Sequence, residues 1–236
     1  MATIERFNSV SFKNLFNQSK NTFLYDDYIG FFNWSKGGNQ AGTGAGIAFI
    51  ASIDSNHSGV EQCSTGTTAT GWSCLSTTPN SFKFSTVTNE LFIYEFVMRT
   101  DVLSDATNEY VVYFGLGDNI AANTEPSNGC YFKYVRTTSV NYQICTASAG
   151  TRTTTTTSIA YPASTYSRYK ITVLGNTLAN FYINDTLLGP IATNINTSNP
   201  ICAFMKIVKT VGTTARQIYE DSFLIDKDVV LSLIHI

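Results

Sequence analysis

The sequence contains little charge and almost no histidine. Charged residues make up 14% of its 236 positions, well below the roughly one quarter that is usual in soluble domains. The only histidines are His57 and His235, so a Ser-His-Asp triad would have to use one of them. Two histidines are too few for a His-rich metal site. Net charge is −2 and no basic cluster occurs. Electrostatic binding of nucleic acid is therefore not expected.

Long apolar segments are also missing. No run approaches the ~18 residues of a membrane-spanning helix. The first 20 residues lack the continuous apolar core of a secretory signal and include Glu5. These features predict synthesis and folding in a cytosol, with no membrane partner.

Cysteine occurs five times, without C-x-x-C or another metal spacing. Cys63 and Cys74 lie symmetrically within one candidate hairpin, and Cys130 and Cys145 within another. Each pair could face across two strands as a disulfide, or could be two small buried thiols. Cytosolic synthesis favours reduced thiols.

Strand patterns recur from about residue 46 onward, and no helical period is sustained after residue 40. Segments 91–99 and 109–117 are apolar on both faces and predict central strands covered on both sides. Segment 169–174 alternates between apolar and polar residues, with Tyr169, Ile171 and Val173 on one face. Many short strands of this kind indicate a β-sandwich or jelly roll.

The remaining strands and loops follow from composition. Segment 180–191 predicts two short strands around a turn at Asn184 and Asp185. Segments 201–209 and 215–225 predict the closing strands. Glycine-rich or polar composition predicts loops at 37–46, 117–129 and 149–158, and the threonines of the last segment also suit a solvent-facing strand.

The chain is divided into three parts. Residues 1–36 have scattered aromatics without alternation and are expected to form either an arm that anchors on a partner subunit or the first sandwich strand. Residues 37–226 form the sandwich. Residues 227–236 are an apolar tail or a last strand, which needs cover in either case.

Carboxylate pairs are the main candidates for chemistry, because many sandwich folds hydrolyse glycans with two acids. Glu95 and Arg99 share a strand face and are expected to form a structural ion pair. Glu220 and Asp221 are adjacent, so a regular strand would point them to opposite faces. With no E-x-D-x-x-E signature, the sequence predicts no enzyme, no catalytic residues and no cofactor.

Three further motifs have ordinary explanations. GTGAG (42–46) is followed by a strand pattern, so it does not predict a phosphate-binding loop. Asp118 and Asn119 could contribute oxygens to a calcium site, but a polar turn is the favoured interpretation and no metal is expected. Five N-x-S/T sequons arise in an Asn- and Thr-rich chain, at Asn17, Asn33, Asn56, Asn184 and Asn196.

A series of segments, in order and spacing, resembles a family of bacteriophage structural proteins with a concanavalin A-like jelly-roll domain. The segments are STGTTATGWSCLST, RTDVLSDATNEYVVYFGLGD, EPSNGCYFKY, TASAGTRTTTTTSIA, FYIN and KTVGTTAR. The resemblance covers about residues 40–226. Asn184-Asp185 stands where the family has Asn-Gly. The resemblance implies an all-β, antiparallel two-sheet sandwich in a virion, and it supplies no catalytic residues.

The resulting expectation is a structural protein of a phage particle: a capsid decoration, head-fibre or tail-fibre component. Its partners would be other virion proteins and further copies of itself, in a homo-oligomer such as a trimer. The alternative is a lectin-like module that binds a surface glycan through loops 117–129 and 149–158. A glycoside hydrolase is the least favoured alternative.

Overall fold

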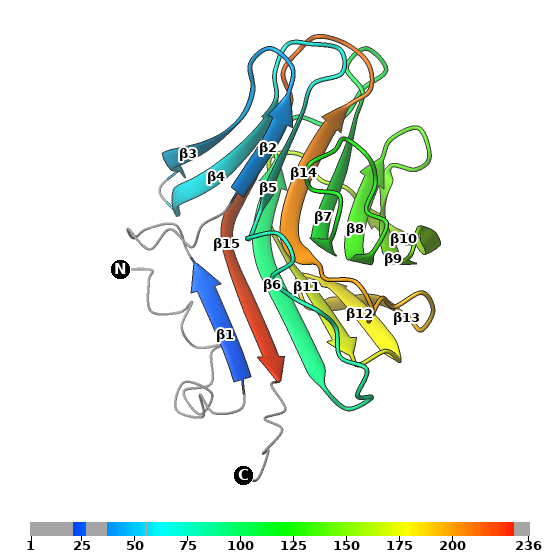
Figure 1. The fold of residues 1–236 in the computed structure, drawn as a ribbon. Helices are drawn as coiled ribbons and strands as arrows, with labels where there is room; N and C mark the ends of the chain where they lie inside the picture. The colour runs from blue at the N-terminus through cyan, green and yellow to red at the C-terminus, as the bar shows by residue number, and fades with distance from the viewer. Residues whose placement is uncertain (1–20, 27–36, 55, 229–236) are drawn as a thin grey trace.

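The computed structural model describes residues 21–26, 37–54 and 56–228. These residues form fifteen strands and no helix, and hence no helix that could cross a membrane. All strand pairings are antiparallel. The strands form two sheets that lie face to face (Figure 1). The predicted all-β two-sheet sandwich is therefore confirmed.

The first sheet, called sheet A, has β6 at its centre. Seven of its strands follow one another in a single order, and the eighth, β1 (Asn21–Asp26), also pairs with β15. Its spatial order is β13 (Thr186–Ile191), β12 (Leu178–Ile183), β11 (Ser167–Leu174), β6 (Leu91–Thr100), β15 (Gln217–Asp228), β4 (His57–Thr65) and β3 (Ala45–Asp54).

The second sheet, called sheet B, contains the consecutive hairpins of the middle of the chain. Its spatial order is β10 (Thr151–Ala160), β9 (Asn141–Ser148), β8 (Gly129–Val135), β7 (Tyr110–Gly117), β14 (Cys202–Lys209), β5 (Trp72–Ser76) and β2 (Gly37–Ala41).

Aromatic side chains fill the space between the sheets. Phe96 and Tyr169 of sheet A meet Phe114 and Phe132 of sheet B, with ring centroids 5.0 to 5.3 Å apart for the pairs Tyr169–Phe114, Phe96–Tyr169 and Phe132–Tyr169. Alternation along each strand brings these rings inward. Tyr169, Ile171 and Val173 are buried in this core while the residues between them are half-buried, as the pattern at 169–174 predicted.

The two strands predicted to be covered on both faces behave differently. β7 is buried on both faces, because a second apolar cluster lies on the outer face of sheet B and includes Tyr113, Tyr131 and Ile120 of the loop Asp118–Asn128. The prediction for 91–99 is wrong for one face. Alternate residues of β6, such as Ile93 and Val97, are only half-buried on the outer face of sheet A.

Two of the three predicted loops are shorter than expected. Segment 37–46 contains β2 and the start of β3, with a turn only around Gly42–Gly44. Most of segment 149–158 belongs to β10, because its β-branched threonines suit an extended strand. The loop at 117–129 is confirmed, since no strand lies between Gly117 and Gly129.

The hairpin at 180–191 is confirmed. β12 and β13 are joined by Asn184 and Asp185, whose φ angles of 47° and 66° are both left-handed. Two consecutive left-handed residues match the twist of a tight hairpin. The closing strands predicted at 201–209 and 215–225 are also present, as β14 and β15.

The cysteine geometry differs from the predicted facing pairs, and all five thiols are free and buried. Cys63 lies in sheet A and Cys74 in sheet B, so they do not share a hairpin. Cys130 and Cys145 do share one, but Cys130 pairs with Thr146 and Cys145 with Tyr131. This offset of one residue places the two thiols on opposite faces, where they cannot bond.

The two chain ends fall mostly outside the described residues. Of the segment 1–36 interpreted as an arm or first strand, the structure describes β1, which lies antiparallel to β15. Of the tail 227–236, it describes Lys227 and Asp228, the last residues of β15.

Candidate functional site

A line of mostly polar side chains crosses the outer face of sheet B. Strand register pairs Lys206 of β14 with Tyr113 of β7, Tyr113 with Lys133 of β8, Lys133 with Gln143 of β9, and Gln143 with Thr156 of β10. Directly paired residues of antiparallel strands lie on the same face. We call these five residues the polar row.

A carboxylate from the loop Asp118–Asn128 lies against the polar row. Glu125 forms an ion pair with Lys133, 2.8 Å from Nζ to Oε2, and a longer one with Arg152, 3.7 Å from Nε to Oε1. Tyr131 donates its hydroxyl hydrogen to Glu125 Oε1 at 2.9 Å. One acid therefore serves two cations, and the cluster has an excess of positive charge and of hydrogen-bond donors.

Solvent reaches one end of the polar row. Lys133 and Glu125 keep 18% of their side-chain surface exposed, and Arg152 keeps 32%. Thr154 and Thr156, next to Arg152 on the same face of β10, are exposed. A ligand lying across β8, β9 and β10 would meet these hydroxyl and charged groups together, with the Gln143 amide buried beneath them.

Apolar residues run beside the polar row. Register aligns Trp72, Val208, Val111 and Val135 across β5, β14, β7 and β8. Trp72 and Val208 are buried in the outer cluster, and Val111 is half-buried. The site thus places donors and acceptors next to an apolar strip, the combination with which proteins hold mixed polar and apolar ligands.

The two phenols of the site, Tyr113 and Tyr131, are not activated as nucleophiles. Burial raises the pKa of the Tyr113 hydroxyl well above its ordinary value, and the nearby Glu125 raises it further. Burial also raises the pKa of Tyr131, as do Cys145 and Glu125. Both phenols therefore stay protonated at neutral pH and act as hydrogen-bonding groups.

The predicted pair of Glu95 and Arg99 does not form. Glu95 pairs with Arg168 at 3.3 Å, and Arg99 pairs with Asp101 at 3.6 Å. Four residues along a strand span roughly 13 Å, which is too far for a direct contact although the two side chains share a face. The guanidinium of Arg99 instead lies over the ring of Tyr219, 5.1 Å from its centroid.

A second pair of acids was missed by sequence reasoning. Glu220 is the cross-strand neighbour of Glu61, and both are buried. Tyr94 donates to Glu220 Oε1 at 3.2 Å inside the sandwich. Asp221 is the extra residue of a β-bulge, which interrupts the regular alternation on which its predicted orientation depended. These acids line the interior and not an open groove.

A cationic and aromatic cluster on sheet A was also missed. Arg99 lies over the rings of Tyr166 and Tyr219, and His57 stacks on Tyr166 with centroids 3.7 Å apart. Tyr219 donates to Gln217 and accepts from Gln62. Only 7% of Tyr219 and 15% of the Arg99 side chain is exposed, so this cluster is less open than the polar row. His235 lies outside the described residues.

The remaining sequence candidates have structural roles. Asp118 Oδ1 accepts hydrogen bonds from the backbone of Ser127 and Asn128, and its Oδ2 accepts from the Asn128 side chain. Its oxygens hold the loop together, and the described residues contain no cluster of three potential metal-ligating side chains. GTGAG (42–46) leads into β3, as predicted. The sequon residue Asn196 is fully buried.

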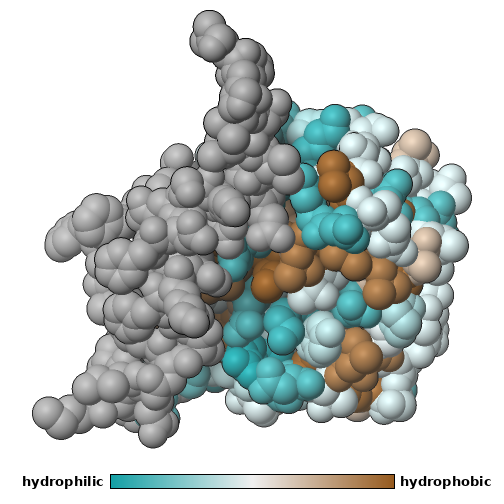
Figure 2. Space-filling view, turned by 90° about the horizontal axis from the view of Figure 1, so that it is seen from below, coloured by the Kyte–Doolittle hydropathy of each residue, from teal (hydrophilic) through white to brown (hydrophobic). Residues whose placement is uncertain are grey.

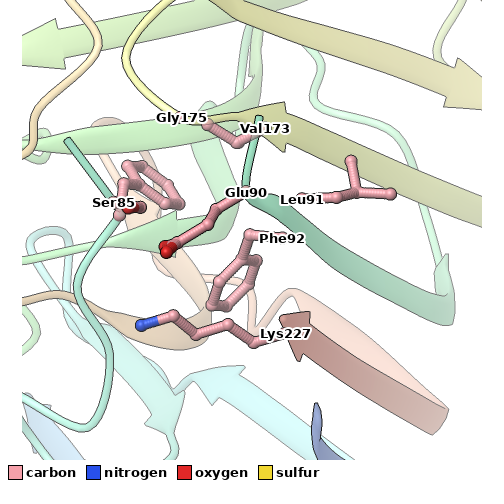
Figure 3. Close-up of a pocket in the computed structure, with 8 residues that line it drawn as sticks. Ser85, Glu90, Leu91, Phe92, Val173, Gly175 and Lys227 are labelled. Carbon is pink, nitrogen blue, oxygen red and sulfur yellow. The ribbon is translucent and has the colours of Figure 1, made fainter. Parts of the chain in front are cut away.

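A shallow pocket lies at the end of the sandwich where β6 begins (Figure 3). Glu90 and Lys227 point into it beside Phe92 and Val173, and it encloses about 180 Å³, open solvent included. Its enclosed part has room for about one water molecule and is too small for a sugar. Figure 2 views the molecule from below and shows apolar and polar patches alternating on the surface not drawn in grey.

Comparison with solved structures defines the class of this fold, a concanavalin A-like jelly roll. Peanut lectin superposes with a TM-score of 0.59 at 7% identity, covering 90% of this chain and 99% of the lectin. The β-glucanase of Bacillus licheniformis gives 0.54 at 11% identity, covering 89% and 98%. A lectin and a hydrolase share the fold, so the fold alone does not decide between binding and catalysis.

Within this class, the chain belongs to the SO2946-like C-terminal domain family, whose model matches residues 56–221. The Shewanella oneidensis MR-1 protein SO2946, itself described as of unknown function, superposes with a TM-score of 0.63 at 14% identity. That match covers 96% of this chain and 98% of the Shewanella protein. No curated protein matches by sequence.

Proposed function

We propose that the protein is a glycan-binding module whose binding surface is the outer face of sheet B, along the exposed end of the polar row. The observation that carries this proposal is the alignment of Lys133, Gln143 and Thr156 across three adjacent strands. Gln143 is only 4% exposed and donates its amide hydrogen to Thr156 Oγ1 at 3.4 Å, so it holds the hydroxyl in place. The ligand would meet the Lys133 ammonium and the Thr156 hydroxyl, two strand spacings or roughly 10 Å apart.

The charges at the site favour binding over hydrolysis. Glycoside hydrolysis by the common mechanism needs two carboxyl groups flanking the bond, one of which is protonated. Glu125 is the carboxylate that contacts the polar row, and it is held between Lys133 and Arg152. Its two oxygens accept hydrogen bonds from Lys133 and Tyr131, an arrangement that suits a hydrogen-bond acceptor.

The excess positive charge suggests a ligand class. Lys133, Arg152 and the buried Lys206 outnumber Glu125 and the nearby Asp118. An acidic sugar, with a carboxylate or sulfate next to its hydroxyl groups, complements this charge. Val135, the half-buried residue of the apolar strip on β8, would contact the carbon-bearing face of such a ring.

The test is a glycan array that contains neutral and acidic polysaccharides, with calorimetry on the strongest ligand. Replacing Lys133 with alanine should weaken binding about tenfold or more, because a hydrogen bond to a charged group contributes about 1.5–3 kcal/mol. Lys170→Ala is the matched control: Lys170 lies on the outer face of sheet A, 4.5 Å from the centroid of the Tyr182 ring, as Lys133 lies 5.9 Å from that of Tyr113. Equal affinity of both variants, or no ligand on the array, would contradict the proposal.

A setting on a phage particle is a second proposal, supported by the sequence resemblance across residues 40–226. In that setting the module would be a capsid decoration or fibre component that displays sheet B outward and attaches to other virion proteins by residues 1–36. Its assembly with further copies would be part of this arrangement. Detection of the protein in purified particles, and its loss from them on deletion of residues 1–30, tests the idea.

A further inference from the structure

Lys206 is a fully buried lysine in the middle of β14, whose other residues are apolar apart from Lys209 at its end. It is 0% exposed, and its neighbours along the outer face of β14 are Phe204 and Val208. Burial lowers its pKa, while Cys74 and Asp118 oppose this shift. A buried ammonium is destabilising unless each of its hydrogens has a hydrogen-bond acceptor.

Three backbone carbonyls of the loop Asp118–Asn128 converge on this ammonium. Nζ donates to the oxygens of Asn119, Ala122 and Thr124 at 2.9, 3.1 and 2.6 Å. An ammonium has three hydrogens and no acceptor, so the protonated form satisfies all three carbonyls and the neutral form would not. The rings of Tyr113 and Phe204 lie 5.6 and 5.8 Å from Nζ and complete the enclosure.

The ammonium ties the middle of the loop to β14. Inside the loop, the Asn119 side chain donates to the Glu125 carbonyl and to Ser127, so Lys206 adds to these contacts. Asp118 and Asn128 close the two ends of the loop through backbone and side-chain hydrogen bonds. Between those ends, Asn119 has a left-handed φ of 56°. Carbonyls gathered without a donor would be destabilising, because buried backbone oxygens need partners. The same loop supplies Glu125, which lies one residue beyond Thr124.

We infer that Lys206 is a positioning residue: its ammonium is a built-in cation that takes the place a bound metal or ammonium ion could fill. It fixes the loop Asp118–Asn128 and so sets Glu125 against Lys133 and Arg152. The consequence for ligand binding rests on the proposed function. The consequence for the loop does not, and the two are measured separately.

The experiment compares Lys206→Ala with Lys206→Met in the full chain by amide hydrogen exchange. Both variants should speed exchange in residues 119–124 about tenfold or more, with β7 and β8 unchanged, because the loop opens locally. Methylammonium at millimolar concentration should restore protection in Lys206→Ala alone, since methionine fills the space without providing a charge. Unchanged exchange in both variants, or equal rescue of both, overturns the inference.

A measurement on the unaltered protein covers the case in which neither variant folds. The ammonium hydrogens of Lys206 should exchange slowly enough to give an NMR cross-peak at neutral pH, whereas those of the exposed Lys83 should not. Lys206 hydrogens that exchange as fast as those of Lys83 would contradict the inference. If the loop results hold but no glycan binds, the proposed function fails while the role of Lys206 stands.

Discussion

At the scale of single residues, the cysteines show how burial determines reactivity. Burial raises the pKa of Cys74 and Cys202 to about 12, and that of Cys145 to about 11. Cys63 and Cys130 are also fully buried, and burial raises their pKa values too. The thiolate is the reactive form, so none of these residues should act as a nucleophile or redox sensor in the folded protein.

The corresponding prediction is slow alkylation. At pH 8 the folded protein should react with iodoacetamide far more slowly than a free cysteine, because at most about one thiol in a thousand is ionised when the pKa is 11 or higher. In guanidinium chloride all five should react. Mass spectrometry counts the labels. Three labels or one after unfolding without reductant would reveal disulfides and would contradict the free thiols of the structure.

The burial of Lys206 was not predictable from its identity alone. In the segment ICAFMKIVK, Lys206 looks like an ordinary solvent-facing residue of an alternating strand. Its burial depends on a loop more than 80 residues earlier in the chain. A lone charge between Phe204 and Val208, on a face that is otherwise apolar, was the signal that could have indicated a buried cation.

At the scale of elements, strand existence was predictable and strand partnership was not. Alternation predicted β11, the apolar segment 201–209 predicted β14, and the Asn184-Asp185 pair predicted the β12–β13 hairpin. Nothing in the sequence pattern shows that the chain passes from sheet A to sheet B between β4 and β5. The glycines between these two strands instead favour a hairpin. Packing on both faces of sheet B sets the register of β8 against β9, which is offset by one residue from a direct pairing of Cys130 with Cys145. The symmetric positions of the two cysteines in the sequence do not show this offset.

The β12–β13 turn offers a prediction at this scale. Asp185 occupies a left-handed conformation that glycine adopts without strain. Replacing Asp185 with glycine should therefore stabilise the fold by about 0.5 kcal/mol, since its ion pair with Arg168 is exposed and such pairs contribute little. Urea unfolding measures the change. Asp185→Ala, which loses the ion pair without gaining conformational freedom, is the control and should be destabilising.

At the scale of the whole molecule, the sandwich followed from composition and alternation, and the site did not. The polar row takes one residue from each of five strands, β7, β8, β9, β10 and β14. Glu125 contacts this row from a loop. Such a site depends on sheet order and register, which arise from tertiary packing. Loop 117–129, which the sequence analysis suggested for glycan binding, contributes Glu125 and the carbonyls that accept from Lys206.

The central claim is that the outer face of sheet B binds a glycan. The most direct measurement is a titration of the isotope-labelled protein with the strongest glycan found by array, followed through its amide NMR signals. The account predicts the largest shifts at Lys133, Gln143 and Thr156, with Glu95 and Lys170 on the outer face of sheet A unchanged. Shifts concentrated on sheet A would contradict it.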